Sequence, residues 1–387
     1  MSNYITIFRQ ILSFLPENLL KKSVEKHEAD RYAKKLSMSE LLKIHLFAHI
    51  TGRDSLRDIT TGLEVNKKRL YHTGMGQVTR SNLSYANNHR PYEVFEELFY
   101  HLVEKCSNSA RKGRFRFKNP LYALDSTKID LCLSQFNWAE YRTAKGAMKL
   151  HHLLDVKSDI PVFMVMSEGK RHDISVIRSL DLPVSSDSIL VFDRGYIDFK
   201  WFEMLDDKGV WFVTRSKKNL NYRFVGQHSL PSGKNMVSDD VIELTGVKTK
   251  DVYEKHVRMV TVFDEKNKKN LSFLTNNFKL AASTIADIYH ARWEIETFFR
   301  WIKQNLKIKT FYGTSKNAVM LQVWSAMIYY LLLSWIKHQV KLSWSLQEIS
   351  RRISSVLFEK MHLLELLSEK FAKEKKPDNR AVQLTLF

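Results

Sequence analysis

Three carboxylate side chains of this sequence have the surroundings needed for metal-assisted chemistry on phosphate esters. Asp125 follows the short apolar run 121–124, and Asp193 follows the continuous apolar run 189–192. Glu296 lies further along the chain, in a segment with helical periodicity. Hard carboxylate oxygens on three separate elements are the ligands with which a pair of Mg²⁺ ions activates a nucleophile and stabilises a leaving oxygen. Taken singly, either aspartate could instead cap the next helix.

Four polar residues share one side of the helix that the segment around Glu296 predicts. At ~100° of rotation per residue, the spacing Y-x2-R-x3-E-x6-K brings them within roughly 60° of one another. They are Tyr289, Arg292, Glu296 and Lys303. An arginine can bind a phosphate through two parallel hydrogen bonds, a lysine supplies a point charge, and a tyrosine hydroxyl donates a hydrogen bond. A solvated amphipathic helix also carries such charges, so the two aspartates give this stripe its significance.

The elements that must hold these residues are two strands and one helix with an apolar face. The run 189–192 predicts a buried strand, and Gly195 allows the chain to turn just after the acid. A second stripe of apolar residues predicts that the helix packs on a core. This stripe consists of Ile288, Ile295, Phe299, Ile302 and Leu306. The polar stripe therefore lies at the edge of the packed face.

Further strands are predicted beside those that carry the aspartates. Residues 149–156 and 160–166 have the pattern of two strands joined by a turn at 158–159. Residues 210–214 predict another strand after a helix near 199–207. The chain thus alternates strands with helices in its middle part.

At these positions the sequence resembles the bacterial DDE transposases of the insertion sequence 4 family, whose signature around the glutamate is called YREK. All four signature residues are present, and Asp193-Arg194-Gly195-Tyr196 is similar to the family's pattern at its second acid. The resemblance implies that Asp125, Asp193 and Glu296 are catalytic and bind Mg²⁺, with Mn²⁺ as an acceptable substitute. It implies contacts to DNA by the other signature residues, and a reaction in which a freed 3′-hydroxyl attacks target DNA without a covalent protein–DNA intermediate.

The resemblance also implies an α/β fold with a ribonuclease-H-like catalytic core. We expect this core, with its basic approach segment, at residues 109–312, interrupted by a β-rich insertion at about 217–275. A helical domain that binds DNA ends is expected at residues 1–108. Residues 313–387 are expected to form a C-terminal helical region that takes part in dimerisation.

The charge of the chain agrees with a polyanionic partner. There are 61 Lys and Arg residues against 42 Asp and Glu residues, which gives a net charge of +19. Charge alone does not distinguish DNA from RNA or a membrane surface. The resemblance specifies double-stranded DNA, both transposon ends and target, bound by a homodimer in a synaptic complex. With two cysteines, the composition favours neither a disulfide framework nor a cysteine-based zinc site, and a cytoplasmic protein is expected.

The N-terminal region predicts helices with candidate DNA contacts. Ser37 and Glu40 have the spacing of a capping box before an apolar run. Arg80 lies in the polar cluster 79–84, which could dock on phosphates and enter the major groove or could simply form a solvated face. The resemblance favours DNA. Trp293, which follows the signature arginine, is a further candidate for packing near a DNA end.

Residues 318–336 are apolar enough to resemble a membrane span. A single span this far along a basic chain would isolate a short tail, whereas a buried helix behind the catalytic helix accounts for the same residues. We therefore expect a core helix and no membrane partner.

Several other residues are possible site members. Relatives that form a hairpin intermediate stack an insertion aromatic on a flipped base, for which Tyr222, Phe224 and Tyr253 are the candidates here. His151 and His152 are adjacent in a predicted strand, so they point to opposite faces and cannot chelate one ion. The two histidines are therefore expected to be structural, and three further acids of the region are competing candidates that lack the matching motif context. They are Asp130, Asp155 and Asp173.

Two alternative functions remain open at this stage. A ribonuclease-H-fold nuclease would cut DNA without joining it, and a DNA-binding repressor would keep the fold without catalysis. The presence of all three carboxylates argues against the repressor.

Overall fold

The computed structural model describes the chain in segments that together cover most of it. These are residues 5–107, 115–142, 145–230, 235–247, 249–305, 311–340 and 343–367. The chain divides into two compact units, one made of Met1–Leu98 with Leu321–Phe387 and the other of Phe99–Met320. The divisions fall inside the helices α7 (Glu93–Ser107) and α12 (Lys316–Val340).

The first unit is helical, and it combines elements from both ends of the sequence. Its shorter elements are α1 (Ile7–Leu12), α2 (Glu17–Lys26), α3 (Met38–Thr51), α4 (Leu56–Val65), α5 (Lys67–Leu70), η1 (Tyr71–Thr73), α6 (Arg80–His89), α13 (Leu346–Ser355) and α14 (Leu363–Leu366). The predicted capping box at the start of α3 is confirmed, since Ser37 and Glu40 satisfy each other's backbone N–H groups. Buried polar contacts join the sequence ends, as the Ser325 hydroxyl lies 3.1 Å from His45 Nδ1 and 2.9 Å from His49 Nε2.

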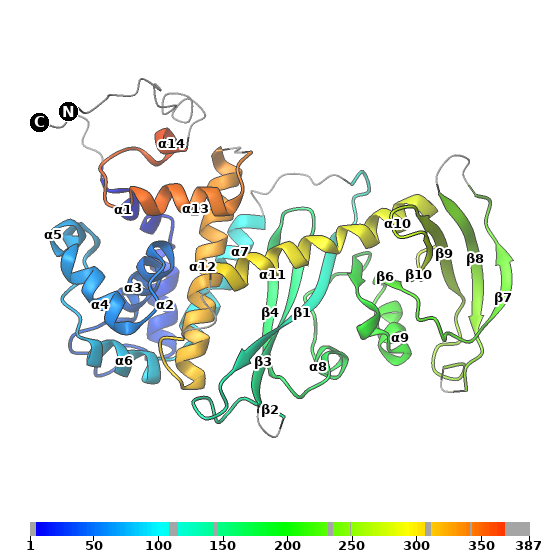
Figure 1. Ribbon diagram of the computed structural model, residues 1–387, viewed down its shortest axis with the longest axis horizontal. Helices are drawn as coiled ribbons and strands as arrows, with labels where there is room; N and C mark the ends of the chain where they lie inside the picture. Colours follow the sequence, from blue (N-terminus) through cyan, green and yellow to red (C-terminus); the bar gives the residue numbers. More distant parts are fainter. Residues whose placement is uncertain are drawn as a thin grey trace, which may run out of the picture. The chain divides into compact units, whose positions relative to one another are not determined.

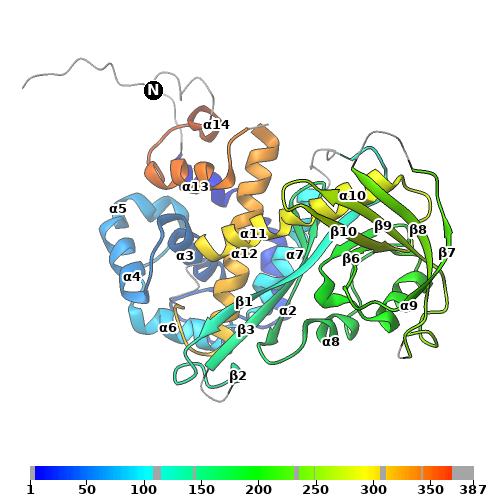
Figure 2. The ribbon, with the colours of Figure 1, turned by 45° about the vertical axis from the view of Figure 1, so that its right-hand side comes forward.

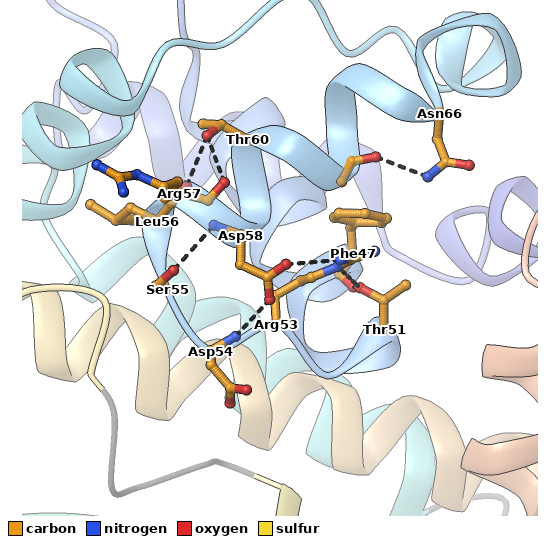
Figure 3. A network of polar contacts seen from close by, with 11 residues as sticks. Phe47, Thr51, Arg53, Asp54, Ser55, Leu56, Arg57, Asp58, Thr60 and Asn66 are labelled. Atoms are coloured by element: carbon orange, nitrogen blue, oxygen red, sulfur yellow. Dashed lines mark hydrogen bonds and ion pairs between the residues drawn. The ribbon is translucent and has the colours of Figure 1, made fainter.

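The start of α4 is fixed by a local polar network (Figure 3). Ser55 accepts a hydrogen bond from the Asp58 N–H at 3.1 Å, which caps the helix. The Asp58 carboxylate in turn pairs with Arg53 at 2.9 Å and accepts the Asp54 N–H at 3.1 Å. These contacts join the end of the α3–α4 connection to the first turn of α4.

Helix α12 is long and apolar, and it is buried. It is the one described helix with the length and composition to cross a membrane, yet 94% of its most apolar window is buried within the fold. The predicted core helix at residues 318–336 is therefore confirmed.

The second unit is organised around one 10-stranded sheet (Figure 1). The strand order is β2-β3-β1-β5-β6-β10-β9-β8-β7, and β4 pairs with β3. The strands are β1 (Leu121–Leu131), β2 (Glu140–Arg142), β3 (Lys145–Asp155), β4 (Ile160–Glu168), β5 (Ile189–Phe192), β6 (Trp211–Arg215), β7 (Tyr222–Gln227), β8 (Met236–Leu244), β9 (Val257–Asp264) and β10 (Lys269–Thr275). Strands β1, β5 and β6 are parallel to one another, and the other pairings are antiparallel.

The inserted strands extend the core sheet. β10 pairs with β6, so β7 to β10 continue the sheet beyond the strand that follows the second aspartate. Residues 217–275 are β-rich, as expected, but the sequence did not predict that their strands would share a sheet with the core. The mixed α/β fold class is confirmed.

Helices cover the two faces of the core sheet. On one face, Leu124 and Phe192 pack with residues of α8 (Asp173–Arg178) and α9 (Phe199–Asp207). Because successive strand residues point to opposite faces, Asp125 lies on the other face. That face bears α10 (Ala282–Ala291) and α11 (Trp293–Asn305), which run across the strands in Figures 1 and 2.

The two adjacent histidines lie on opposite faces, as predicted. His151 Nε2 lies 2.8 Å from the Ser167 hydroxyl, whereas the His152 ring packs edge-on against Phe298 and Phe299 of α11. Both are fully buried, and burial lowers the pKa of His151 to about 4 and of His152 to about 3. They therefore act as neutral core residues.

A buried ion pair ties the inserted strands to the start of α10. Arg258 on β9 donates to both oxygens of Asp239 on β8 at 2.7 Å, and both side chains are almost fully buried. The same guanidinium donates to the carbonyl oxygens of Asn277 and Leu280, just before α10. Arg258 thus fixes the segment that leads into the helix carrying Tyr289.

We expect Arg258→Met to lower the free energy of unfolding by about 3–5 kcal/mol, because it leaves the Asp239 carboxylate buried without its partner. Urea denaturation followed by circular dichroism would measure this loss. Arg223→Met is the matched control, since Arg223 forms an exposed ion pair with Glu243 and should cost at most about 1 kcal/mol. Equal losses from the two substitutions would contradict the assignment.

Candidate functional site

Asp125 and Asp193 lie side by side at the same level of the sheet. β1 and β5 are parallel neighbours in which Leu124 is level with Phe192, and each aspartate is the next residue along its strand. Since Leu124 and Phe192 both belong to the core on the α8–α9 face, both aspartates project toward the α10–α11 face. The competing acids have structural partners: Asp130 pairs with Lys128, Asp173 with Lys149, and Asp155 accepts from its own turn.

Asp193 keeps one carboxylate oxygen engaged locally. Its Oδ1 accepts the backbone N–H of Gly195 at 2.7 Å, which caps the short helix η2 (Arg194–Tyr196). A Cβ atom at position 195 would lie 2.8 Å from this oxygen, so glycine permits the close approach. The helix-capping role that any such aspartate could have is present, and it orients the carboxylate at the strand end.

Arg292 joins the first aspartate to the glutamate. Its Nη1 lies 3.3 Å from Asp125 Oδ2, and its Nη2 lies 2.8 Å from Glu296 Oε1. The Arg292 side chain is 11% exposed, and its Nε is buried without a hydrogen-bond partner in the described part of the chain. Burial acts to lower the pKa of Arg292, but the bond to Glu296 and the neighbouring charges outweigh burial and raise it. Arg292 is therefore a cation held between two carboxylates.

Tyr289 completes the cluster on the side of Asp193. Its ring packs on Phe273 of β10 at 4.6 Å between centroids, and the Arg292 guanidinium lies 5.7 Å from the ring centre. Burial raises the pKa of the Tyr289 hydroxyl, the charge of Arg292 opposes this, and the charge of Asp193 adds to it. Tyr289 therefore remains a neutral phenol that can donate a hydrogen bond.

The three carboxylates repel one another. Burial raises the pKa of Asp125 to about 6, and the charges of Asp193 and Glu296 add to this effect. The Ser126 N–H and the charge of Arg292 act in the opposite direction. Negative charge is thus concentrated at one point of the sheet surface.

We expect Asp125 to make the metal-free protein less stable as the pH rises from about 4 to about 6. An aspartate carboxyl in water has a pKa of 3.8, whereas that of Asp125 in the folded chain is about 6, so the folded chain binds more protons in this window. Relative to Asp125→Asn, the wild type should lose up to about 3 kcal/mol of unfolding free energy between pH 4 and pH 7. Urea denaturation in EDTA would measure this difference. A difference that does not vary with pH would contradict it.

The chemistry of the three carboxylates fits a hard divalent cation, since they offer only oxygen donors and carry unbalanced negative charge. In the described segments, however, no three His, Cys, Asp or Glu side chains are gathered closely enough to hold one ion. Glu296 is instead engaged by Arg292. Binding one metal ion through all three carboxylates therefore requires them to come closer together, and the ion would compete with Arg292 for the charge of Glu296.

The signature residue Lys303 and the candidate DNA contact Trp293 both lie on α11 (Trp293–Asn305). The helix is interrupted at Arg292, where the Ile295 N–H bonds to the Arg292 carbonyl three residues back. The predicted apolar stripe is buried at Ile288, Ile295, Phe299 and Ile302, and Leu306 lies outside the described residues. Trp293 is 58% exposed at the start of α11, and Lys303 is exposed two turns beyond Glu296.

Two predicted groups lie away from the carboxylates in sequence. Arg80 is exposed at the first position of α6, which Thr79 caps. Tyr222 and Phe224 are 44% and 58% exposed on the edge strand β7. Tyr253 is 2% exposed, and its hydroxyl faces Asp206, so a stacking role for Tyr253 is ruled out by its burial.

Basic residues at the same sheet edge were missed by the sequence analysis. Arg215 ends β6, one residue beyond Thr214, which is level with Phe192. Its charge acts on the Tyr289 hydroxyl, so it lies near the cluster. Parallel strands align their carboxyl ends, and this rule could have found Arg215 once β5 and β6 had been paired.

Comparisons with known proteins give a consistent picture. Residues 116–332 match the family described as "Transposase DDE domain", and residues 3–76 match a domain family of unknown function. The "Probable transposase for insertion sequence element IS5377" of Geobacillus stearothermophilus is 30% identical over 334 residues, which cover 84% of this chain and 85% of that protein. Among solved structures, a piggyBac transposase synaptic complex with hairpin DNA aligns with a TM-score of 0.50 and 9% identity, covering 97% of this chain and 83% of that one.

Proposed function

The chain belongs to the DDE transposases of insertion sequences, and from this premise we propose that Asp125, Asp193 and Glu296 are its catalytic carboxylates. The fold is α/β with a ribonuclease-H-like core, and the protein is an enzyme of DNA transposition. The observation that carries the residue assignment is the level placement of Asp125 and Asp193 on parallel strands, with Arg292 linking Asp125 to Glu296.

The family uses a divalent metal, and we propose Mg²⁺, with Mn²⁺ as a substitute, at the three carboxylates. When bound, the ions supply the positive charge that activates the attacking oxygen and stabilises the leaving one. The oxygen-only donor set supports this choice of metal, and so does the pKa of Asp125, which burial and the charges of Asp193 and Glu296 raise despite the opposing charge of Arg292.

The basic and phenolic residues of the cluster are proposed to hold the phosphate. Arg292 has a planar fork that matches phosphate oxygens, and its buried Nε has no partner in the described part of the chain. The neutral Tyr289 hydroxyl can donate a hydrogen bond to the same group. Lys303 and Trp293, exposed on α11, are proposed to contact the flanking DNA.

The proposed reaction has two phosphoryl-transfer steps at this site. In the first, a water oxygen bonds to phosphorus at the transposon end and the P–O3′ bond breaks, which leaves a 3′-hydroxyl and a 5′-phosphate. In the second, that 3′-hydroxyl attacks a target phosphodiester, forming a new P–O3′ bond and releasing the target 3′-hydroxyl. Each step transfers one proton from the attacking oxygen to the leaving one through solvent.

The remaining parts of the chain are assigned by the same proposal. Residues 1–108 would bind the terminal inverted repeats, with Arg80 on α6 contacting the phosphate backbone. Residues 313–387 would contribute to the homodimer that holds two ends and the target in one synaptic complex. The protein would act on DNA in the cytoplasm, consistent with its net charge of +19.

The test is cleavage and joining of DNA in solution. Purified protein is incubated with Mg²⁺ and a duplex carrying the DNA ends that flank its gene, together with a supercoiled target plasmid. Nicked ends and joined products that disappear in EDTA would support the proposal. Cleavage without joining would support a nuclease instead, and binding without cleavage in either Mg²⁺ or Mn²⁺ would support a DNA-binding repressor.

A further inference from the structure

A second feature lies directly beside Asp193. Two loops border an open pocket of about 480 Å³. One loop contributes Asp193, Arg194 and Gly195, and the other contributes Lys217, Lys218 and Asn219. The basic residues of this pocket, Arg194, Lys217 and Lys218, have no role in the reaction proposed above. Three of its lining residues, Arg194, Lys217 and Lys218, are basic and one, Asp193, is acidic, so the lining suits a charged ligand better than an apolar one.

The two loops meet because of the sheet topology. β5 and β6 are parallel neighbours with Phe192 level with Thr214, so both strands leave the sheet at the same edge. The chain leaving β5 forms the turn at Arg194, and the chain leaving β6 reaches Lys217 and Lys218 a few residues later. The pocket is therefore fixed by strand pairing.

The cations of the pocket lack ion-pair partners in the part of the chain that the structure describes. Arg194, Lys217 and Lys218 are exposed, and none forms an ion pair with the residues that the structure describes. Other cations of this region do have carboxylate partners. Lys208 pairs with Asp181, Lys255 with Asp206 and Asp207, and Arg223 with Glu243.

We infer that this pocket, the Arg194–Lys218 pocket, binds a backbone phosphodiester of DNA next to the one that reacts at Asp193. The inference rests on the proposed function, because it takes Asp193 as the place of reaction. Arg194 offers a planar fork and the two lysines offer point charges, which together recognise phosphate oxygens without reading bases. A phosphate held here fixes the register of the strand relative to the carboxylates.

The charge arrangement explains why a neighbouring phosphate is favoured over the reacting one. Asp193 occupies one wall of the pocket and repels an anion that approaches it directly. The three cations come from the loops beyond the strand ends, where a DNA strand can continue past the reaction centre. The strand concerned belongs either to the transposon end or to the target, and both carry the same phosphodiester.

The test compares the double variant Lys217→Ala, Lys218→Ala with a matched control, Lys200→Ala, Lys266→Ala. The control removes two exposed lysines of the same unit that lie outside the pocket. Binding of labelled duplexes is measured in Ca²⁺ at several salt concentrations, so that cleavage is not needed for the result. We expect the pocket variant to bind about tenfold more weakly at 0.1 M salt, and its salt slope to fall by about 1–2 relative to the control.

A neutral methylphosphonate placed at single positions near the cut then locates the contact. It should weaken binding by the wild type at one or two positions, and should have no added effect on the pocket variant at those positions. Weaker binding to duplexes that carry the transposon end assigns the pocket to that end. Weaker binding to target duplexes alone assigns it to the target. Equal salt slopes for the two variants, or methylphosphonate effects that persist in the pocket variant, would overturn the inference. Weakened binding by the pocket variant while the wild type cuts neither end nor target would refute the proposed function but leave the pocket a DNA site.

Discussion

Glu296→Gln is expected to reduce metal-dependent cleavage of DNA ends by about 10³-fold or more, which corresponds to ~4 kcal/mol or more of transition-state free energy. The amide has the shape of the carboxylate but lacks its charge, so it binds a divalent cation poorly. It also loses the charge that pairs with Arg292 at 2.8 Å. Cleavage is measured in single-turnover experiments with protein in excess over DNA.

Binding of DNA should hardly change in the same variant, because removal of a negative charge does not weaken an interaction with a polyanion. Glu294→Gln is the matched control, since Glu294 lies on the same helix and is not part of the cluster. Asp125→Asn and Asp193→Asn should give losses similar to that of Glu296→Gln. Cleavage by Glu296→Gln within tenfold of the wild-type rate would exclude Glu296 from the catalytic set.

Arg292→Ala is expected to reduce cleavage about 10²-fold, since it would remove the proposed phosphate contact from a partly buried site. The same substitution is expected to increase the affinity of the protein for a divalent metal ion. In the metal-free protein Arg292 supplies the positive charge between Asp125 and Glu296. Without Arg292, the negative charges of Asp125 and Glu296 are no longer neutralised between them, so a divalent cation should bind to the pair more tightly.

Thermal unfolding with and without Mn²⁺ separates these two roles of Arg292. Mn²⁺ should raise the melting temperature of Arg292→Ala by about 2–4 °C more than that of the wild type, which is the shift expected from ~1 kcal/mol. Arg292→Lys keeps the charge without the planar fork, so it should resemble the wild type in the Mn²⁺ shift and the alanine variant in cleavage. An equal or smaller Mn²⁺ shift for the alanine variant would show that Arg292 and the metal do not compete for the carboxylates.

Local patterns in the sequence predicted the parts of the site that depend on local structure. An apolar run before Asp193 predicts a buried strand, and a 3.6-residue period predicts that Arg292 lies near Glu296, although the helix is interrupted at Arg292 between α10 and α11. The buried helix α12 followed from its composition and position. Each of these features is determined by residues of a single strand or a single helical segment.

The contacts that assemble the site could not be predicted in this way. The ion pair between Arg292 and Asp125 joins residues 167 positions apart, and the pairing of β10 with β6 places an inserted strand inside the core sheet. Phe224 and Tyr253 are both stacking candidates by sequence, yet Phe224 lies exposed on the edge strand β7, whereas Tyr253 lies between β8 and β9 and is buried in the core beside α9. Such outcomes are decided by which strands pair, and local periodicity carries no record of that choice.

The helical unit is built from both ends of the sequence, and this constrains the order in which the chain can fold during synthesis. Its N-terminal helices leave the ribosome first, but Thr6 pairs with Lys360, and Phe8 packs edge-on against Phe358. Ser325 supplies the hydroxyl that His45 and His49 share. The N-terminal helices therefore wait for almost the whole chain to be translated, and the sheet unit, whose strands are all made earlier, can complete its core before them.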